Sequence, residues 1–282
     1  MPIIQQATIE DRKRLLELFP LANLRQEWPT IKGLKEEICY SVAADATQPQ
    51  IDKVTKFINE NLSCCKQHVY IFSRDASATL PTTVPHGEKI LEEPGVRSLY
   101  AIRVSYNIVL RDPLEDGVLE FLWPVRIELT PQYFIARFVV LEKNPSSYFD
   151  RPVYVGGKTV DEKAVLSEIT ASGLLSPADL NKGIKKLWAD GLIDSTRTKY
   201  KTSISTASEA MDEERGIKEF NPELYAAVQA APLYTTVFQI PEDKSSVCTF
   251  STDPSNGIIG FTRYSEKKGD TDIVIEQILT NN

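Results

Sequence analysis

Few side chains in this sequence could do acid–base chemistry near neutral pH. The chain has two histidines, His68 in a predicted strand and His86 in a Pro-rich loop between Pro85 and Gly87. Histidine is the side chain whose ordinary pKa lies between pH 5 and 8, and a catalytic histidine also needs a partner to orient it. No such partner can be identified by spacing for either residue, so no catalytic residue is assigned. An enzyme would require a pocket that contains His86 or paired carboxylates.

Metal and nucleotide sites are not indicated by the spacing of their usual ligands. Zinc is usually held by closely spaced pairs of Cys or His, and neither C-x-x-C nor H-x-x-x-H occurs. The run G-G-K-T at residues 156–159 has the end of a phosphate-binding loop, but Pro152 stands where that motif requires a glycine. A tight hairpin turn is therefore preferred there, and the acidic run at residues 212–214 is interpreted as solvent-exposed. We expect no metal and no cofactor.

The cysteines and the hydrophobic pattern predict an intracellular protein, cytoplasmic or nuclear. Cys39, Cys64, Cys65 and Cys248 are too few and too irregularly spaced for a disulfide framework, and an adjacent pair such as Cys64-Cys65 rarely forms an unstrained bridge. Reduced, mostly buried thiols are expected. No apolar run is long enough to cross a membrane, and the first residues lack the pattern of a signal peptide, so no membrane contact is expected.

Charge is distributed unevenly along the chain. The net charge of −7 argues against a general nucleic-acid coat, because phosphate binding depends on clustered Lys and Arg. However, residues 180–203 hold six basic and two acidic residues, whereas residues 221–282 hold four basic and eight acidic ones. The basic residues of the first segment are the candidate nucleic-acid-binding residues: Lys182, Lys185, Lys186, Arg197, Lys199 and Lys201.

The same segment has the pattern of an amphipathic helix followed by a strand. In the helix predicted at residues 177–190, the apolar residues that recur at helical spacing are Leu180, Ile184, Leu187 and Trp188. The three lysines lie on the opposite side of that helix. Gly191 is in the usual position for ending a helix, and the basic residues 197–201 read as a strand.

This succession of helix, glycine cap and basic strand resembles a winged helix-turn-helix module, and the residues that carry the resemblance are L-W-A-D-G-L-I at 187–193. The resemblance implies that the helix enters the major groove of DNA and that the strand, as a wing, touches the DNA backbone. Winged helices also serve as protein-binding elements. The alternative is therefore that the module packs against the β domain or against a partner protein.

The first 66 residues are predicted to form a small helical domain. Helices are expected at residues 8–19, from Thr30 and from Thr47. The apolar residues that share one stripe of the second helix are Ile31, Leu34, Ile38 and Val42. These N-terminal helices are a candidate docking surface for another protein.

From residue 67 the hydrophobic period changes to two. Residues 67–150 are predicted as the first part of an antiparallel β-sheet, with strands at 68–72, 97–111, 117–129 and 132–141 and a loop at 73–94. Pro124 has no N–H to donate, so its strand is expected to break there or to lie at an edge with a bulge.

The rest of the chain is predicted to return to helices and then to strands. Residues 151–220 are interpreted as a helical, winged-helix-like insertion, with a hairpin at 153–160, helices at 161–170 and 177–190, and a charged stretch at 209–219. Residues 221–282 are predicted to complete the sheet with strands at 233–240, 247–251, 257–264 and 272–279. The expected fold class is therefore α+β: a small helical N-terminal domain and a mainly antiparallel β domain.

The expected function is that of a non-enzymatic nucleic-acid-binding or regulatory protein that uses the basic winged-helix-like segment, with DNA as the candidate partner. The alternative is a protein–protein interaction subunit of a larger assembly that makes no direct nucleic-acid contact. In that case the N-terminal helices or the acidic C-terminal strands would be the docking surface.

Overall fold

A computed structural model of the chain describes residues 13, 16, 21–45, 66–111, 114–140, 153–201, 206–210, 216–240, 249–262 and 270–282. The chain divides into two compact units, each assembled from segments that are far apart in sequence. Unit 1 contains Met1–Leu62, Thr79–Glu128 and Leu141–Ser172, and unit 2 contains Ser63–Ala78, Leu129–Val140 and Gly173–Asn282.

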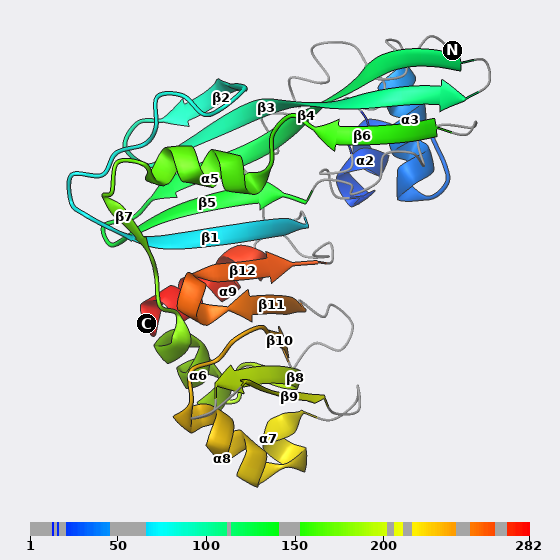
Figure 1. The fold of residues 1–282 in the computed structure, drawn as a ribbon. Helices are drawn as coiled ribbons and strands as arrows, with labels where there is room; N and C mark the ends of the chain where they lie inside the picture. The colour runs from blue at the N-terminus through cyan, green and yellow to red at the C-terminus, as the bar shows by residue number, and fades with distance from the viewer. Residues whose placement is uncertain are drawn as a thin grey trace. The chain divides into compact units, whose positions relative to one another are not determined.

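Both units combine helices with antiparallel strands, and strands dominate (Figure 1). Every pairing between the described strands for which a register is given is antiparallel. The α+β class is therefore confirmed in this broad sense. Among the residues that the structure describes, no helix is both long and apolar enough to cross a membrane.

Unit 1 is built on two long strands, β3 (Arg97–Arg111) and β4 (Leu114–Leu129), which pair along their whole length. The other edge of β3 is shared by β2 (Gly87–Glu93) near its start and by β6 (Val153–Lys158) near its end. Alternate residues of β3 are buried on one face, as a period of two predicts. They are Ser98, Tyr100, Ile102, Val104, Tyr106, Ile108 and Leu110.

The described helices of unit 1 are α2 (Leu21–Glu27), α3 (Lys35–Asp45) and α5 (Glu162–Thr170). In α3 the predicted apolar positions Ile38 and Val42 are buried, but Leu34, which precedes the helix, is 69% exposed. The helix predicted at 161–170 is confirmed as α5, whose N-cap Asp161 accepts from the Ala164 N–H at 3.0 Å.

The strands of unit 2 follow the order β5-β1-β12-β11-β10-β8-β9, and β7 pairs with the end of β1 beyond β12. Because β12 pairs with β1, strands near the end of the chain join a sheet that begins at residue 67, as expected. The strand bounds are β1 Gln67–Arg74, β5 Tyr133–Val139, β7 Leu175–Pro177, β8 Asp194–Lys201, β9 Thr206–Ala210, β10 Thr236–Gln239, β11 Phe250–Asp253 and β12 Ile258–Phe261.

Helices cover one face of the unit 2 sheet, which we call the inner face. They are α6 (Asn181–Ala189), α7 (Ile217–Phe220), α8 (Pro222–Ala230) and α9 (Asp270–Thr280), and a 3-10 turn, η3 (Pro254–Asn256), joins β11 to β12. Trp188 of α6 meets Phe238 of β10 and Tyr225 of α8 edge-on, each with ring centroids 5.2 Å apart. This core holds α6 firmly against the sheet.

Two predictions are wrong, one about the glycines at 156–157 and one about Pro124. Residues 153–158 form the single strand β6 and not a tight hairpin; Gly156 lies so close to β3 that a Cβ there would be 3.3 Å from the Asn107 carbonyl oxygen. Strand β4 runs through Pro124, opposite Ala101, with no shift in register against β3. The chain therefore tolerates the missing N–H without the predicted break.

Three predicted element boundaries also need correction. Residues 272–279 are helical, within α9, because Val274, Ile275 and Ile278 are buried at helical spacing in the core of unit 2. The predicted loop at 73–94 contains β2. The helix predicted at 177–190 begins only at Asn181, since residues 175–177 pair with β1.

Several predictions fall outside the described residues. They concern most of the helix at 8–19, the helix from Thr47, the polar break at 144–150, the acidic run at 212–214, and Cys64, Cys65 and Cys248. Cys39 lies in α3 and is buried.

Candidate nucleic-acid interface

Helix α6 presents its apolar face to the core as predicted. Leu180, Ile184, Leu187 and Trp188 are each 1% exposed or less. The helix ends at Gly191, whose φ of +76° lies in the left-handed region. Its N–H donates to the Trp188 carbonyl, and the next N–H, that of Leu192, donates to the Leu187 carbonyl, so the cap satisfies two carbonyls at the end of the helix.

The three lysines of α6 have partners within the protein. Lys185 Nζ donates to the carbonyls of Gln229 and Ala231, at 2.8 Å each, just where α8 ends. Partial burial lowers the pKa of Lys185, and the charge of Asp179 opposes that shift. Lys185 therefore serves the end of α8 and is poorly placed for a phosphate.

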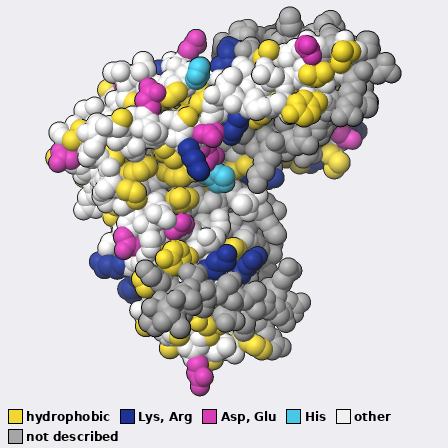
Figure 2. All heavy atoms as spheres, viewed as in Figure 1, with side chains coloured by type: hydrophobic (Ala, Val, Ile, Leu, Met, Phe, Trp, Pro, Cys, Tyr) yellow, Lys and Arg dark blue, Asp and Glu magenta, His cyan; other side chains and the backbone are white. Residues whose placement is uncertain are grey.

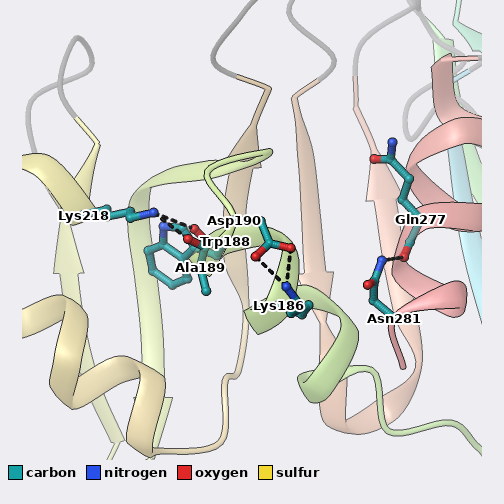
Figure 3. Close-up of polar contacts among 7 residues, drawn as sticks. All are labelled: Lys186, Trp188, Ala189, Asp190, Lys218, Gln277 and Asn281. Atoms are coloured by element: carbon teal, nitrogen blue, oxygen red, sulfur yellow. Dashed lines mark hydrogen bonds and ion pairs between the residues drawn. The ribbon is translucent and has the colours of Figure 1, made fainter.

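The other two lysines are exposed but also engaged. Lys182 Nζ donates to the Asn282 carbonyl at 2.8 Å. Lys186 Nζ forms an ion pair with both carboxylate oxygens of Asp190, each at 2.6 Å, one turn further along the helix (Figure 3). An exposed pair of this kind contributes little to stability, but the charge of Asp190 offsets that of Lys186, which weakens its attraction for a phosphate.

Neighbouring elements flank α6 on two sides. Gly183 touches α9 so closely that a Cβ at this position would lie 2.1 Å from the Ile278 carbonyl oxygen. Lys185 faces the end of α8. The residues of α6 that are exposed are Lys182, Lys186 and Ala189, at spacings of four and three. This narrow stripe is all that the helix offers to a ligand.

Strand β8 carries the other half of the basic cluster. Arg197 and Lys199 are exposed, and neither side chain has a hydrogen-bond or ion-pair partner among the described residues. Lys201 is the last residue of the strand. In β9, the residues opposite these three are Ala210, Ser208 and Thr206, all uncharged. Within the paired residues that the structure describes, no acidic residue of β9 therefore stands opposite these cations.

The orientation of β8 is fixed by its inward-facing polar residues. The hydroxyls of Thr198 and Thr236 are 3.0 Å apart in the buried interior. Ser195 Oγ donates to the carbonyls of Arg197 and Val237, at 2.9 and 2.7 Å, where the register of β8 against β10 shifts. Because strand side chains alternate, a buried Thr198 places Arg197 and Lys199 on the opposite face of the sheet.

That opposite face is visible in the space-filling view. Lys and Arg side chains gather over the part of unit 2 where Figure 1 shows α6, β8 and β10 (Figure 2). The start of β8 is held to α6 by Asp194, whose Oδ1 accepts from the Trp188 indole N–H at 2.9 Å. The helix and the basic strand thus form one rigid arrangement within unit 2.

Comparisons with protein-family models, with curated proteins and with solved structures found no match for this chain. The function must therefore be argued from the site alone. Among the described residues, no group of three or more His, Cys, Asp or Glu side chains could hold a metal ion.

The two histidines belong to elements other than α6 and β8. His68 is half-buried in β1, where it pairs with Gly260 of β12. His86 has a φ of +53° in the turn closed by the Gly87 N–H and the Val84 carbonyl.

Two residues that form hydrogen bonds with backbone groups at the ends of α6 were not predicted from the sequence. Lys218 Nζ donates to the carbonyls of Trp188 and Ala189, at 3.3 and 2.7 Å, beyond the last turn of the helix (Figure 3). Asn282 accepts from the Gly183 N–H at 3.2 Å, at the other end. Both are far from α6 in sequence, and no local pattern marks such contacts.

Proposed function

We propose that this chain is a non-enzymatic nucleic-acid-binding protein whose phosphate-contacting element is the β8–β9 hairpin. The observation that supports it is the pair of exposed cations, Arg197 and Lys199, on one face of β8 with uncharged residues opposite them in β9. Positively charged side chains without internal partners attract phosphates and release the counterions that surround nucleic acid.

In this proposal α6 and the hairpin keep the winged-helix-like order inferred from the sequence, but their roles differ. The hairpin is the wing and makes the main contact. Helix α6 is a scaffold, because its lysines are engaged with Gln229, Ala231, Asn282 and Asp190. Lys182 and Lys186 are secondary contacts at most, since a phosphate would have to compete with their present partners.

The expected affinity follows from the number of contacts. Three basic side chains, Arg197, Lys199 and Lys201, support only weak, non-specific binding, with a Kd of about 10⁻⁴ to 10⁻⁶ M at physiological salt. The binding should be tighter at low salt, where counterion release contributes more.

Charge reversal tests the proposal. The double variant Arg197→Glu with Lys199→Glu should weaken binding to labelled DNA and RNA at low salt by about tenfold or more, since two attractive contacts become repulsive. The matched control is Lys182→Glu with Lys186→Glu, which makes the same change of charge on α6 and should have a much smaller effect. Circular dichroism verifies that both variants are folded. Equal affinity for the wild type and the β8 variant would overturn the proposal.

A second function, as an interaction subunit of a larger assembly, is favoured by a different observation. At the N-terminal helical segment, Leu34 is 69% exposed and Tyr40 of α3 is 49% exposed, so two large apolar side chains are accessible to a partner there. If this function is correct, the native complex survives charge reversal in β8 and is lost in the variant Leu34→Ser with Tyr40→Ser.

A further inference from the structure

Strand β8 contains one residue more than its partner β10 just before the first basic side chain of the strand. Phe238 of β10 pairs with Ser195 of β8, but the next residue of β10, Val237, pairs with Arg197. Thr196 is therefore an extra residue, and β8 has a β-bulge at this point. A bulge changes which face of the sheet the following side chains occupy.

Burial along β8 follows this change of face. Ser195 and Thr198 are both 0% exposed, although residues three apart in a regular strand point to opposite faces. If the strands paired regularly from Ser195 onward, Arg197 would lie opposite Thr236, which is also 0% exposed. Its guanidinium group would then point into the interior, where an unpaired charge is costly. The bulge therefore keeps Arg197 on the exposed face of β8.

The strand is anchored on both sides of the bulge. Before it, Asp194 Oδ1 accepts from the Ser195 N–H at 2.7 Å and from the Trp188 indole N–H at 2.9 Å. After it, the hydroxyls of Thr198 and Thr236 lie 3.0 Å apart in the interior. Because neither side can slide without losing these contacts, the extra residue must be accommodated between positions 195 and 198.

The hydroxyl of Ser195 lies inside the bulge and bonds the backbone on both strands. It shares its proton between the carbonyls of Arg197 and Val237, at 2.9 and 2.7 Å. Its oxygen also accepts from the Arg197 N–H at 3.3 Å. Arg197 and Val237 are the pair that resumes the ladder after the extra residue. Since Ser195 is 0% exposed, water cannot easily replace its hydroxyl.

We propose that Ser195 is a positioning residue of the phosphate-contacting hairpin: its hydroxyl holds the bulge that aims Arg197 outward. This proposal rests on the function proposed above and adds to its site a buried residue that does not itself touch the ligand. Bulges beside functional sites commonly serve to re-aim one side chain. Here the side chain is the first cation of β8, and the groups that hold it are the backbone N–H and carbonyl of Arg197 itself.

The variant Ser195→Ala tests the proposal through the salt dependence of binding. The full-length protein is titrated with a fluorescein-labelled oligothymidine of about 12 nucleotides. Log K against log salt should have a slope of about −2 in the wild type and about −1.4 in Ser195→Ala, because one of three phosphate contacts is lost. Affinity at low salt should fall about threefold or more. The matched control is Ser251→Ala, whose hydroxyl donates to the Gly260 carbonyl at 3.3 Å in the same sheet and whose loss should leave the slope unchanged.

A second variant separates positioning from a general loss of stability. In Ser195→Ala with Thr196 deleted, the extra residue is gone, so β8 can pair regularly with β10 while Arg197 stays opposite Val237. The bulge and its hydroxyl are then no longer needed, and the slope should return to about −2. A role of Ser195 in stability alone does not predict this recovery, because the deletion restores no hydrogen bond.

The outcomes separate this proposal from the function on which it rests. Circular dichroism verifies folding, and a reduced slope in Ser195→Ala that recovers in the deletion variant supports the proposal. A folded Ser195→Ala with the wild-type slope overturns it while leaving nucleic-acid binding intact. If Ser195→Ala alone does not fold, the deletion variant decides: it overturns the proposal if it also fails to fold or keeps the reduced slope. No binding by the wild type at low salt overturns both.

Discussion

Lys185 donates from one ammonium group to two backbone carbonyls, those of Gln229 and Ala231. Its neighbour Lys186 is bound to Asp190, whereas Arg197 and Lys199 have no partner among the described residues. At the scale of the single residue, the hydrogen-bond and ion-pair partners of a basic side chain therefore decide whether it can bind a phosphate. A charged group that already has hydrogen bonds must lose them before it binds a phosphate, and this loss reduces the gain in free energy.

The residue type at position 183 is also decided by a close neighbour, the backbone of α9 at Ile278. The variant Gly183→Ala should lower the free energy of unfolding by at least about 1 kcal/mol, because the new Cβ would meet the Ile278 carbonyl oxygen at 2.1 Å and force α6 away from α9. Urea denaturation measures this change. The matched control is Gly157→Ala, where a Cβ meets nothing within 4 Å and the change should stay within about 0.5 kcal/mol. Equal stability of the two variants would contradict this account of the α6–α9 contact.

At the scale of the element, α6 depends on residues from elsewhere in the chain. Its N-cap, Leu180, has no side chain that can accept a hydrogen bond, and Asn282 supplies the acceptor for the Gly183 N–H. Asn282 also donates to the Asp179 carbonyl at 2.8 Å, and Lys218 occupies the other end of the helix. A helix capped in this way is stable only when the tail of unit 2 is in place.

Removal of the distant cap should therefore be measurable. Asn282→Ala removes these two hydrogen bonds and a longer one to the Tyr133 hydroxyl, at 3.4 Å, and should cost about 0.5–2 kcal/mol of stability, the range for loss of a helix N-cap. Asn281→Ala is the control, since its amide donates to the Gln277 carbonyl within α9 (Figure 3) and should cost less than about 0.5 kcal/mol. Thermal unfolding of the two variants gives the comparison. An Asn282→Ala variant as stable as Asn281→Ala would show that α6 does not need this cap.

The same elements show how far sequence could predict the fold. The strands with strict apolar alternation, such as β1 and β3, were predicted, as were α5 and the glycine cap of α6. Strand β2 was missed because Gly87–Glu93 is mostly polar. Helix α9 was predicted as a strand because its β-branched residues suit both structures, and burial against the core of unit 2 decided between them.

The candidate site was only half predictable. The basic cluster is visible in the sequence, and the Lys186–Asp190 pair follows helical spacing. The partners of Lys182 and Lys185, however, lie 44 to 100 residues away, so no spacing rule could show that these two lysines are engaged. The face on which Arg197 lies is continued by Val237 of β10, a strand from a separate part of the chain. Such a surface exists only once the strand order is known.

At the scale of the whole molecule, unit 2 is held together by β1. This strand pairs with β5 on one edge and with β12 and β7 on the other, so it joins segments that are far apart in sequence. Its residues Val69 and Ile71 are fully buried in the core. Unit 2 should consequently open as one cooperative body around β1.

Hydrogen exchange followed by mass spectrometry tests this cooperativity. The amides of β1 should be among the slowest to exchange in the chain, because they are released only by global opening of unit 2. Those of β9, which among the described strands pairs with β8, should exchange much faster. Similar protection of β1 and β9 would show that the sheet does not open as described.

The most direct test of the central claim, that β8 and not α6 contacts phosphate, is the salt dependence of oligothymidine binding. For three contacts to a single strand, a plot of log K against log salt should have a slope of about −2. Arg197→Gln with Lys199→Gln should reduce the slope to about −0.7, and Lys182→Gln with Lys186→Gln should leave it unchanged. A slope that falls in the α6 variant and stays at the wild-type value in the β8 variant would contradict the claim.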